Sequence, residues 1–139
     1  MRMEPEPHGL IQQGSSFQIE FRLDGSRLRA FVTGIAGSLA QVSEYWHLIA
    51  TETVRTGVSR LLVVDYTGGD LLTAEDLELF ILGLDGLGLE NVRCAYVGGN
   101  PNRTVQNEAT EILAREHGFV ARVFGIEAEA SIWLRHGAS

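Results

Sequence analysis

The sequence contains no lysine and only one cysteine, and these shortages exclude several kinds of chemistry. All eleven basic residues among the 139 are arginine, so a P-loop lysine, a Schiff-base lysine and a lysine general base are excluded. The single cysteine, Cys94, cannot form an intrachain disulfide, which fits a reducing compartment. We therefore expect a cytoplasmic protein in which Cys94 is a buried structural thiol.

Long apolar runs and concentrated positive charge are also missing. No apolar stretch approaches the roughly 20 residues that span a bilayer, and residues 1–9 lack the apolar core of a signal peptide. The net charge is −7, with the acids spread along the chain. Nucleic-acid binding needs a concentrated basic face, so neither nucleic acid nor a membrane span is expected.

Metal-binding and hydrolase patterns cannot be found either. The histidines, at positions 8, 47, 117 and 136, are far apart and lack partners at metal-ligand spacing. No serine lies in the Gly-x-Ser-x-Gly setting of a hydrolase. We expect no metal, no cofactor and no catalytic residue.

What is present indicates a globular protein. Hydrophobic residues make up 45% of the chain and charged residues 21%, which is typical of a folded domain. Residues 1–15 are polar and interrupted by proline and glycine, and predict a flexible leader. The remaining length, residues 16–139, suits a single domain.

The periodicity of apolar residues predicts an α/β fold. Alternation from Phe17 predicts a strand, and Asp24-Gly25 a hairpin turn back into a second strand over 28–33. Helical spacing then alternates with apolar strands at 61–64, 92–97 and 120–124, and a last helix covers 127–136. This order predicts a mixed, mostly parallel sheet of about five strands, preceded by an antiparallel hairpin and combined with about four helices.

This order resembles the STAS fold of anti-sigma-factor antagonists and sulfate-transporter tails. The strand ending in Asp65, the helix starting near Thr73, and Val-Phe-Gly-Ile-Glu-Ala-Glu-Ala-Ser-Ile-Trp-Leu at 123–134 carry the resemblance. The last stretch is similar to a subgroup of small bacterial STAS-like proteins, which are also compared with lipid-carrying CRAL-TRIO domains. The resemblance implies a bacterial regulatory domain.

The resemblance also implies that a phosphorylation switch is missing. In partner-switching members this helix begins with Asp-Ser-Ser-Gly, whose serine is phosphorylated. Here the equivalent run is Thr73-Ala-Glu-Asp76, with Ala74 and Glu75 at the serine positions. Glu75 either mimics a phosphate or is an ordinary first-turn acid, and the second interpretation is favoured. Thr73 is either a phosphoacceptor or, as N-caps usually are, occupied by backbone amides.

Two further positions follow strands. Asp65 lies where open parallel sheets place ligand crevices, although an aspartate there commonly accepts from turn amides instead. Arg103 ends the loop Gly98-Gly-Asn-Pro-Asn-Arg, whose free amides could hold an anion. That loop lacks the Walker lysine and the dinucleotide glycine spacing, and an asparagine cap after a turn is favoured.

These observations lead to two functional hypotheses. The first is a non-enzymatic regulatory module that binds a protein through the surface around 65–76, with Asp65, Thr73, Glu75, Asp76 and Arg103 as candidate binding residues. The alternative is binding of a small amphiphile or lipid-like molecule between helices and sheet, which requires an internal apolar cavity. Side chains that could line such a groove are Trp46, Phe80, Leu84 and Trp133, although residues at helical spacing are more often plain core. A homodimer is left open.

Overall fold

A six-stranded sheet forms the centre of the protein. The computed structural model describes residues 9–136, and its strands lie in the sheet in the order in which they occur along the chain. They are β1 (Leu10–Gln13), β2 (Phe17–Asp24), β3 (Arg27–Gly34), β4 (Arg60–Asp65), β5 (Arg93–Gly98) and β6 (Val120–Phe124). The first three strands pair antiparallel and the rest parallel. The predicted α/β fold, with its opening hairpin, is confirmed.

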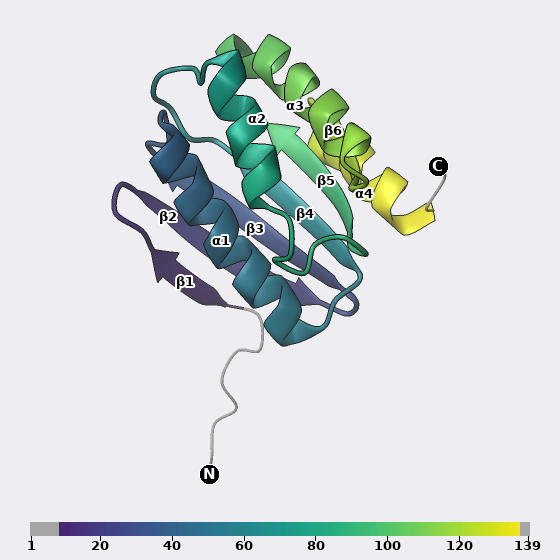
Figure 1. The fold of residues 1–139 in the computed structure, drawn as a ribbon. Helices are drawn as coiled ribbons and strands as arrows, with labels where there is room; N and C mark the ends of the chain where they lie inside the picture. Colours follow the sequence, from purple (N-terminus) through teal and green to yellow (C-terminus); the bar gives the residue numbers. More distant parts are fainter. Residues whose placement is uncertain (1–8, 137–139) are drawn as a thin grey trace.

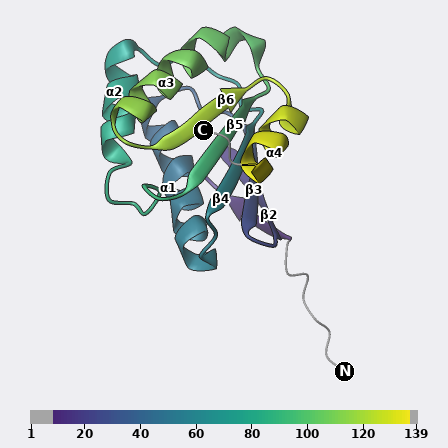
Figure 2. The same cartoon turned by 90° about the vertical axis from the view of Figure 1, so that its right-hand side faces the viewer.

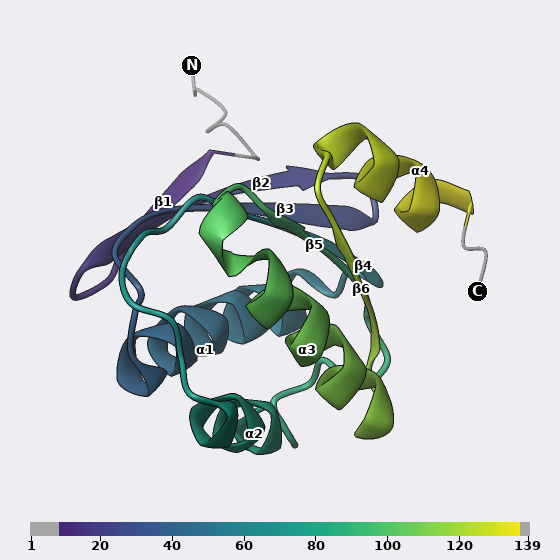
Figure 3. The ribbon, with the colours of Figure 1, turned by 90° about the horizontal axis from the view of Figure 1, so that it is seen from above.

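Helices cover both faces of the sheet unequally. The helices are α1 (Leu39–Thr56), α2 (Ala74–Gly83), α3 (Thr104–Glu116) and α4 (Glu127–His136), with a short 3-10 turn, η1 (Pro101–Arg103), before α3. Figure 1 shows α1, α2 and α3 in front of the sheet. Seen edge-on, α4 lies on the opposite face (Figures 2 and 3). The fold is therefore three-layered, with a thick layer of helices on one side only.

The first strand corrects the predicted leader. Leu10–Gln13 pairs with β2 in antiparallel register, with Leu10 opposite Phe21, although residues 1–15 were predicted to be flexible. Leu10 and Ile11 remain 42% and 60% exposed. Their backbone is held by hydrogen bonds to β2 rather than by burial of their side chains. The sequence therefore shows no alternation of apolar residues from which this strand could be predicted. Residues 1–8 of the predicted leader, with His8, and the predicted helix stop at Gly137 lie outside the described residues.

Alternation along the strands divides the core into two clusters. On the face toward α1, α2 and α3, inward residues of β2, β3 and β4 pack against the helices: Phe17, Ile19, Phe21, Leu28, Ala30, Val32, Leu61 and Val63. On the face toward α4, the smaller cluster contains Leu62, Val64, Ala95, Val97, Ala130, Trp133 and Leu134. β4 is covered on both sides, as its continuous apolar run indicates.

An ion pair and a ring contact attach α4 to its face of the sheet. Arg29 on β3 donates to both carboxylate oxygens of Glu127, at 2.7 and 3.1 Å. Hydrogen bonding to Arg29 lowers the pKa of the Glu127 carboxyl. The Arg93 guanidinium lies 4.1 Å from the centre of the Trp133 ring. Trp133 therefore lies on the other side of the sheet from Trp46, so the two do not line one groove, and Trp133 is a core residue, as helical spacing favours.

Candidate functional site

Asp65 ends β4 and points into the thick layer of helices. Its side chain is only 3% exposed, yet it accepts four hydrogen bonds. The main-chain N–H and the hydroxyl of Thr67 donate to Oδ1 at 2.8 and 2.6 Å. The hydroxyls of Tyr45 and Tyr96 both donate to Oδ2 at 2.5 Å. The carboxylate is thus bound both by its own turn, as the sequence favours, and by two tyrosines from other elements.

The two tyrosines are neutral donors. Tyr45 lies on α1 and Tyr96 on β5. Burial, followed by the negative charge of Asp65, raises the pKa of both phenols well above the ordinary value. Each hydroxyl has one hydrogen to donate, and in both residues that hydrogen is directed to Asp65. What each hydroxyl still offers is acceptor capacity at its oxygen, part of which Trp46 uses at Tyr45.

Arg103 completes this buried network. It is 5% exposed and donates through Nη1 to the Thr67 hydroxyl at 3.2 Å. Through Nη2 it reaches the carbonyl oxygens of Ala36, Gly68 and Asp70, at 3.2, 2.9 and 3.3 Å. Because arginine cannot accept, the Thr67 hydroxyl accepts from Arg103 and donates to Asp65. A directed chain of hydrogen bonds therefore joins the arginine to the carboxylate.

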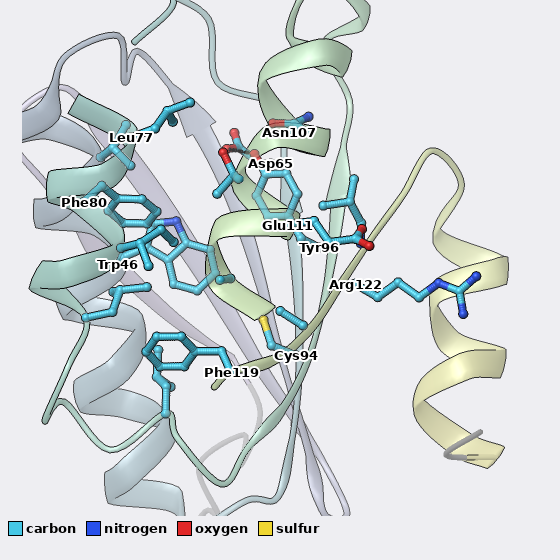
Figure 4. Close-up of a pocket in the computed structure, with 18 of the residues that line it drawn as sticks. Trp46, Asp65, Leu77, Phe80, Cys94, Tyr96, Asn107, Glu111, Phe119 and Arg122 are labelled. Atoms are coloured by element: carbon cyan, nitrogen blue, oxygen red, sulfur yellow. Dashed lines mark hydrogen bonds between the residues drawn. The ribbon is translucent and has the colours of Figure 1, made fainter. Parts of the chain in front are cut away.

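A pocket lies beside this network. It is a cavity of about 100 Å³ between the sheet and α1, α2 and α3. Its walls are mostly apolar, from Val42, Trp46, Leu77, Phe80, Ile81, Leu84, Leu89, Val92 and Ala114. Figure 4 shows the apolar rings of Trp46, Phe80 and Phe119 apart from Asp65 and Asn107, which lie together at one end. The pocket thus has an apolar body and one polar end.

The structure separates the residues that the sequence proposed for binding. Asp65 and Arg103 come together through Thr67 and line the pocket. Thr73 and Asp76 lie instead at the start of α2, where the Thr73 hydroxyl accepts from the Asp76 N–H at 3.0 Å, so the N-cap interpretation is confirmed. Glu75 is exposed on the outer surface. The candidate residues therefore form two groups, one internal and one external.

Three residues of the site, Tyr45, Tyr96 and Asn107, were not found from the sequence. Thr67 belongs to the turn whose amides the sequence offers to Asp65, and its N–H does donate to that carboxylate. Tyr45 and Tyr96 lie 20 and 31 residues from Asp65, and no local pattern connects them to it. Asn107 lies within an ordinary amphipathic helix. Of the predicted groove residues, Trp46, Phe80 and Leu84 do line the pocket.

Comparison with known proteins gives similarity in fold. No family model matches the chain, and no curated protein matches it either. Among solved structures, it is similar to an uncharacterised protein of the DUF3478 family with a SpoIIAA-like fold, from Shewanella loihica PV-4. The TM-score is 0.52 at 17% identity, covering 96% of this chain and 99% of that one. The chain therefore has a STAS-like, SpoIIAA-like fold.

A second solved structure is more distant. It is the MdcD–MdcE heterodimer of Pseudomonas malonate decarboxylase, at a TM-score of 0.41 and 15% identity, covering 70% of this chain and 48% of that one. Within residues 9–136, no helix is both long and apolar enough to cross a bilayer. The same residues contain no cluster of three or more side chains suited to hold a metal ion.

Proposed function

We propose that this STAS-like domain binds a small apolar molecule in the pocket between the sheet and α1, α2 and α3. The observation that carries the proposal is the cavity of about 100 Å³, with apolar walls and polar groups at one end. Ligand sites commonly combine an apolar lining with a few placed polar groups. An apolar cavity of about 150 Å³ holds benzene; this pocket is smaller but partly open to solvent, so it suits a short chain or a single ring rather than a complete lipid.

The proposal includes binding without catalysis. The thiol of Cys94 lines the pocket, and burial raises its pKa to about 12. A thiol is a poor nucleophile when it stays protonated at neutral pH. The carboxylate of Asp65 already accepts four hydrogen bonds. If the carboxylate bound a reacting group instead, one of these donors would lose its acceptor, which is costly in a buried site. These groups support a binding role.

Filling the pocket is expected to abolish ligand binding. Ala114 on α3 is buried and lines the cavity, so Ala114→Leu places additional carbon atoms where a ligand would lie. We expect toluene binding, measured by ligand-observed NMR, to weaken at least tenfold. The free energy of unfolding should change by no more than about 1–2 kcal/mol, because added carbon first fills empty space.

The matched control for this variant is Ala128→Leu. Ala128 is an exposed residue of α4, on the other face of the sheet, so the control adds the same atoms away from the pocket. It should bind toluene like the parent protein. Equal toluene affinity in the Ala114→Leu variant and the parent would contradict the proposed pocket.

A second candidate function is protein binding through the outer face of α2. Glu75, Leu79 and Leu82 follow one another at helical spacing, and the two leucines are 49% and 51% exposed. Large apolar side chains grouped on a surface indicate an interaction site. The inner face of the same helix lines the pocket through Leu77 and Phe80. A regulatory role without the serine switch would use this exposed face.

Charge reversal on this face tests the second candidate. In pull-downs from the native host, Glu75→Lys is expected to reduce recovery of a stable partner at least fivefold. A partner surface that complements the acid would be repelled by the positive charge of a lysine. Glu129→Lys, at an exposed acid in the first turn of α4, is the matched control and should retain the partner. Equal recovery of the partner with Glu75→Lys and with the parent protein would contradict protein binding through the outer face of α2.

A further inference from the structure

The polar end of the pocket has its own hydrogen-bonding requirements. The hydroxyls of Tyr45 and Tyr96 both donate to Asp65, so toward the pocket their oxygens can only accept. A ligand that offers nothing but acceptors would face these oxygens without a hydrogen bond. A ligand that carries an O–H or N–H could donate to them.

Asn107 adds both kinds of group at the same end. It lies on α3, is only 8% exposed and lines the pocket. Figure 4 shows it beside Asp65 and Tyr96. Its amide makes no hydrogen bond with the described residues, and its atoms are not among the buried polar atoms that lack a partner, so the amide is open toward the pocket or solvent. One acceptor oxygen and one donor NH₂ group are therefore available to a bound molecule.

The backbone opposite Asn107 leaves room for this amide. A Cβ atom placed on Gly98 would lie 2.3 Å from the Asn107 amide nitrogen. A larger residue at the end of β5 would require the amide to shift. The amide of Asn107 therefore packs directly against the Gly98 backbone at this end of the pocket.

The charges around the polar end are already balanced. The carboxylate of Asp65 is joined through Thr67 to the guanidinium of Arg103. Glu111, which also lines the pocket, accepts from the Val123 N–H at 2.8 Å and lies 3.4 Å from Arg115. An additional charge brought by a ligand would lose its water, and burial of such a charge is costly. The Arg103 guanidinium already donates through both Nη atoms, and only its Nε is left without a partner among the described residues.

From these contacts we propose that the ligand has an uncharged head group that both donates and accepts a hydrogen bond, as an alcohol does. Its hydroxyl lies between the tyrosine oxygens and the amide of Asn107, and its apolar part lies against Trp46 and Phe80. This inference rests on the proposed ligand-binding function and specifies the chemical class of the ligand. The same contacts disfavour carboxylates, such as fatty acids.

Five one-ring compounds test this requirement. Benzyl alcohol and anisole have the same atoms, but only the alcohol carries an O–H. Toluene has no head group, benzoate is an anion and protonated benzylamine is a cation. Dissociation constants are measured at neutral pH by titration of the full chain with NMR detection.

We expect benzyl alcohol to bind about threefold to tenfold more tightly than anisole, the ratio that one additional net hydrogen bond provides. Both charged compounds should bind at least tenfold more weakly than the alcohol. Tighter or equal binding of anisole, benzoate or protonated benzylamine would overturn the inference while leaving ligand binding intact. Failure of all five compounds, including toluene, would instead overturn the proposed function itself.

A variant then locates the effect at Asn107. In Asn107→Leu, the preference for benzyl alcohol over anisole should disappear while toluene still binds. Asn91→Leu, at an exposed asparagine that does not line the pocket, is the control and should keep the preference. A preference retained in Asn107→Leu would contradict the role of the amide. Because the comparison of compounds on the parent protein decides the main question, poor folding of the variant would not leave it open.

Discussion

Replacement of Asp65 by alanine is expected to lower the free energy of unfolding by about 3–5 kcal/mol, the usual cost of removing one partner from a buried charged network. The variant leaves the hydroxyls of Tyr45 and Tyr96 without their acceptor. It also leaves the buried guanidinium of Arg103 without the carboxylate to which Thr67 connects it. Each buried donor that loses its acceptor adds a penalty, so the effect is larger than that of one hydrogen bond.

Urea unfolding followed by circular dichroism measures this loss. Asp65→Asn should have a smaller effect than Asp65→Ala, because its amide oxygen still accepts while its NH₂ group cannot. The control is Asp85→Ala at an exposed acid, which is expected to change stability by less than about 0.5 kcal/mol. A loss below about 1 kcal/mol for Asp65→Ala would show that the network contributes little to folding.

The same variant bears on the pocket. Without Asp65, the two tyrosine hydrogens are free to point toward a ligand, and the polar end becomes a donor rather than an acceptor. The preference for an alcohol over an ether should then fall, because an ether oxygen can accept from a freed phenol. Stability and ligand preference therefore depend on one carboxylate, and both can be measured on the same protein.

The order of strands and helices was predictable because each unit buries its own periodic face. Ile19 and Phe21 alternate with polar residues, Leu61–Val64 is continuously apolar, and Thr73 precedes a helical stripe. Period and capping are local signals, and they agree with the sheet that forms. β1 was missed because its stability comes from pairing with β2, a contact that its own four residues do not encode.

The site was only partly predictable, because its contacts are long-range. Asp65 and its turn could be predicted, since the acid ends an apolar run. Tyr96 could be assigned to the site only after β5 is aligned with β4. Tyr96 pairs with Val63, two residues before Asp65, so Tyr96 and Asp65 lie on the same face of the sheet. Tyr45 requires the orientation of α1 against that face. Helical spacing places Tyr45 and its neighbours but does not say which of them reaches the sheet.

Replacement of Arg103 by methionine is the second large expected effect, a loss of about 2–4 kcal/mol in the free energy of unfolding, given the cost of unpaired buried groups. The guanidinium holds together two loops, because it donates to the carbonyls of Ala36, Gly68 and Asp70. Methionine fills similar space but cannot donate. Arg135→Met, at an exposed arginine of α4, is the matched control and should change stability by less than about 0.5 kcal/mol.

Combining Arg103→Met with Asp65→Ala tests whether the two charges act as one network. The sum of the two single losses should exceed the loss of the double variant by about 1–3 kcal/mol, since residues of one hydrogen-bonded network are coupled.

Anion binding at Arg103, the alternative that the sequence disfavours, can be tested separately. If the guanidinium bound phosphate, phosphate would raise the melting temperature of the parent and not that of Arg103→Met. Because its Nη atoms already donate to Thr67 and to three carbonyls, we expect equal, small shifts in both proteins. A selective gain in the parent would mean that an anion displaces these contacts.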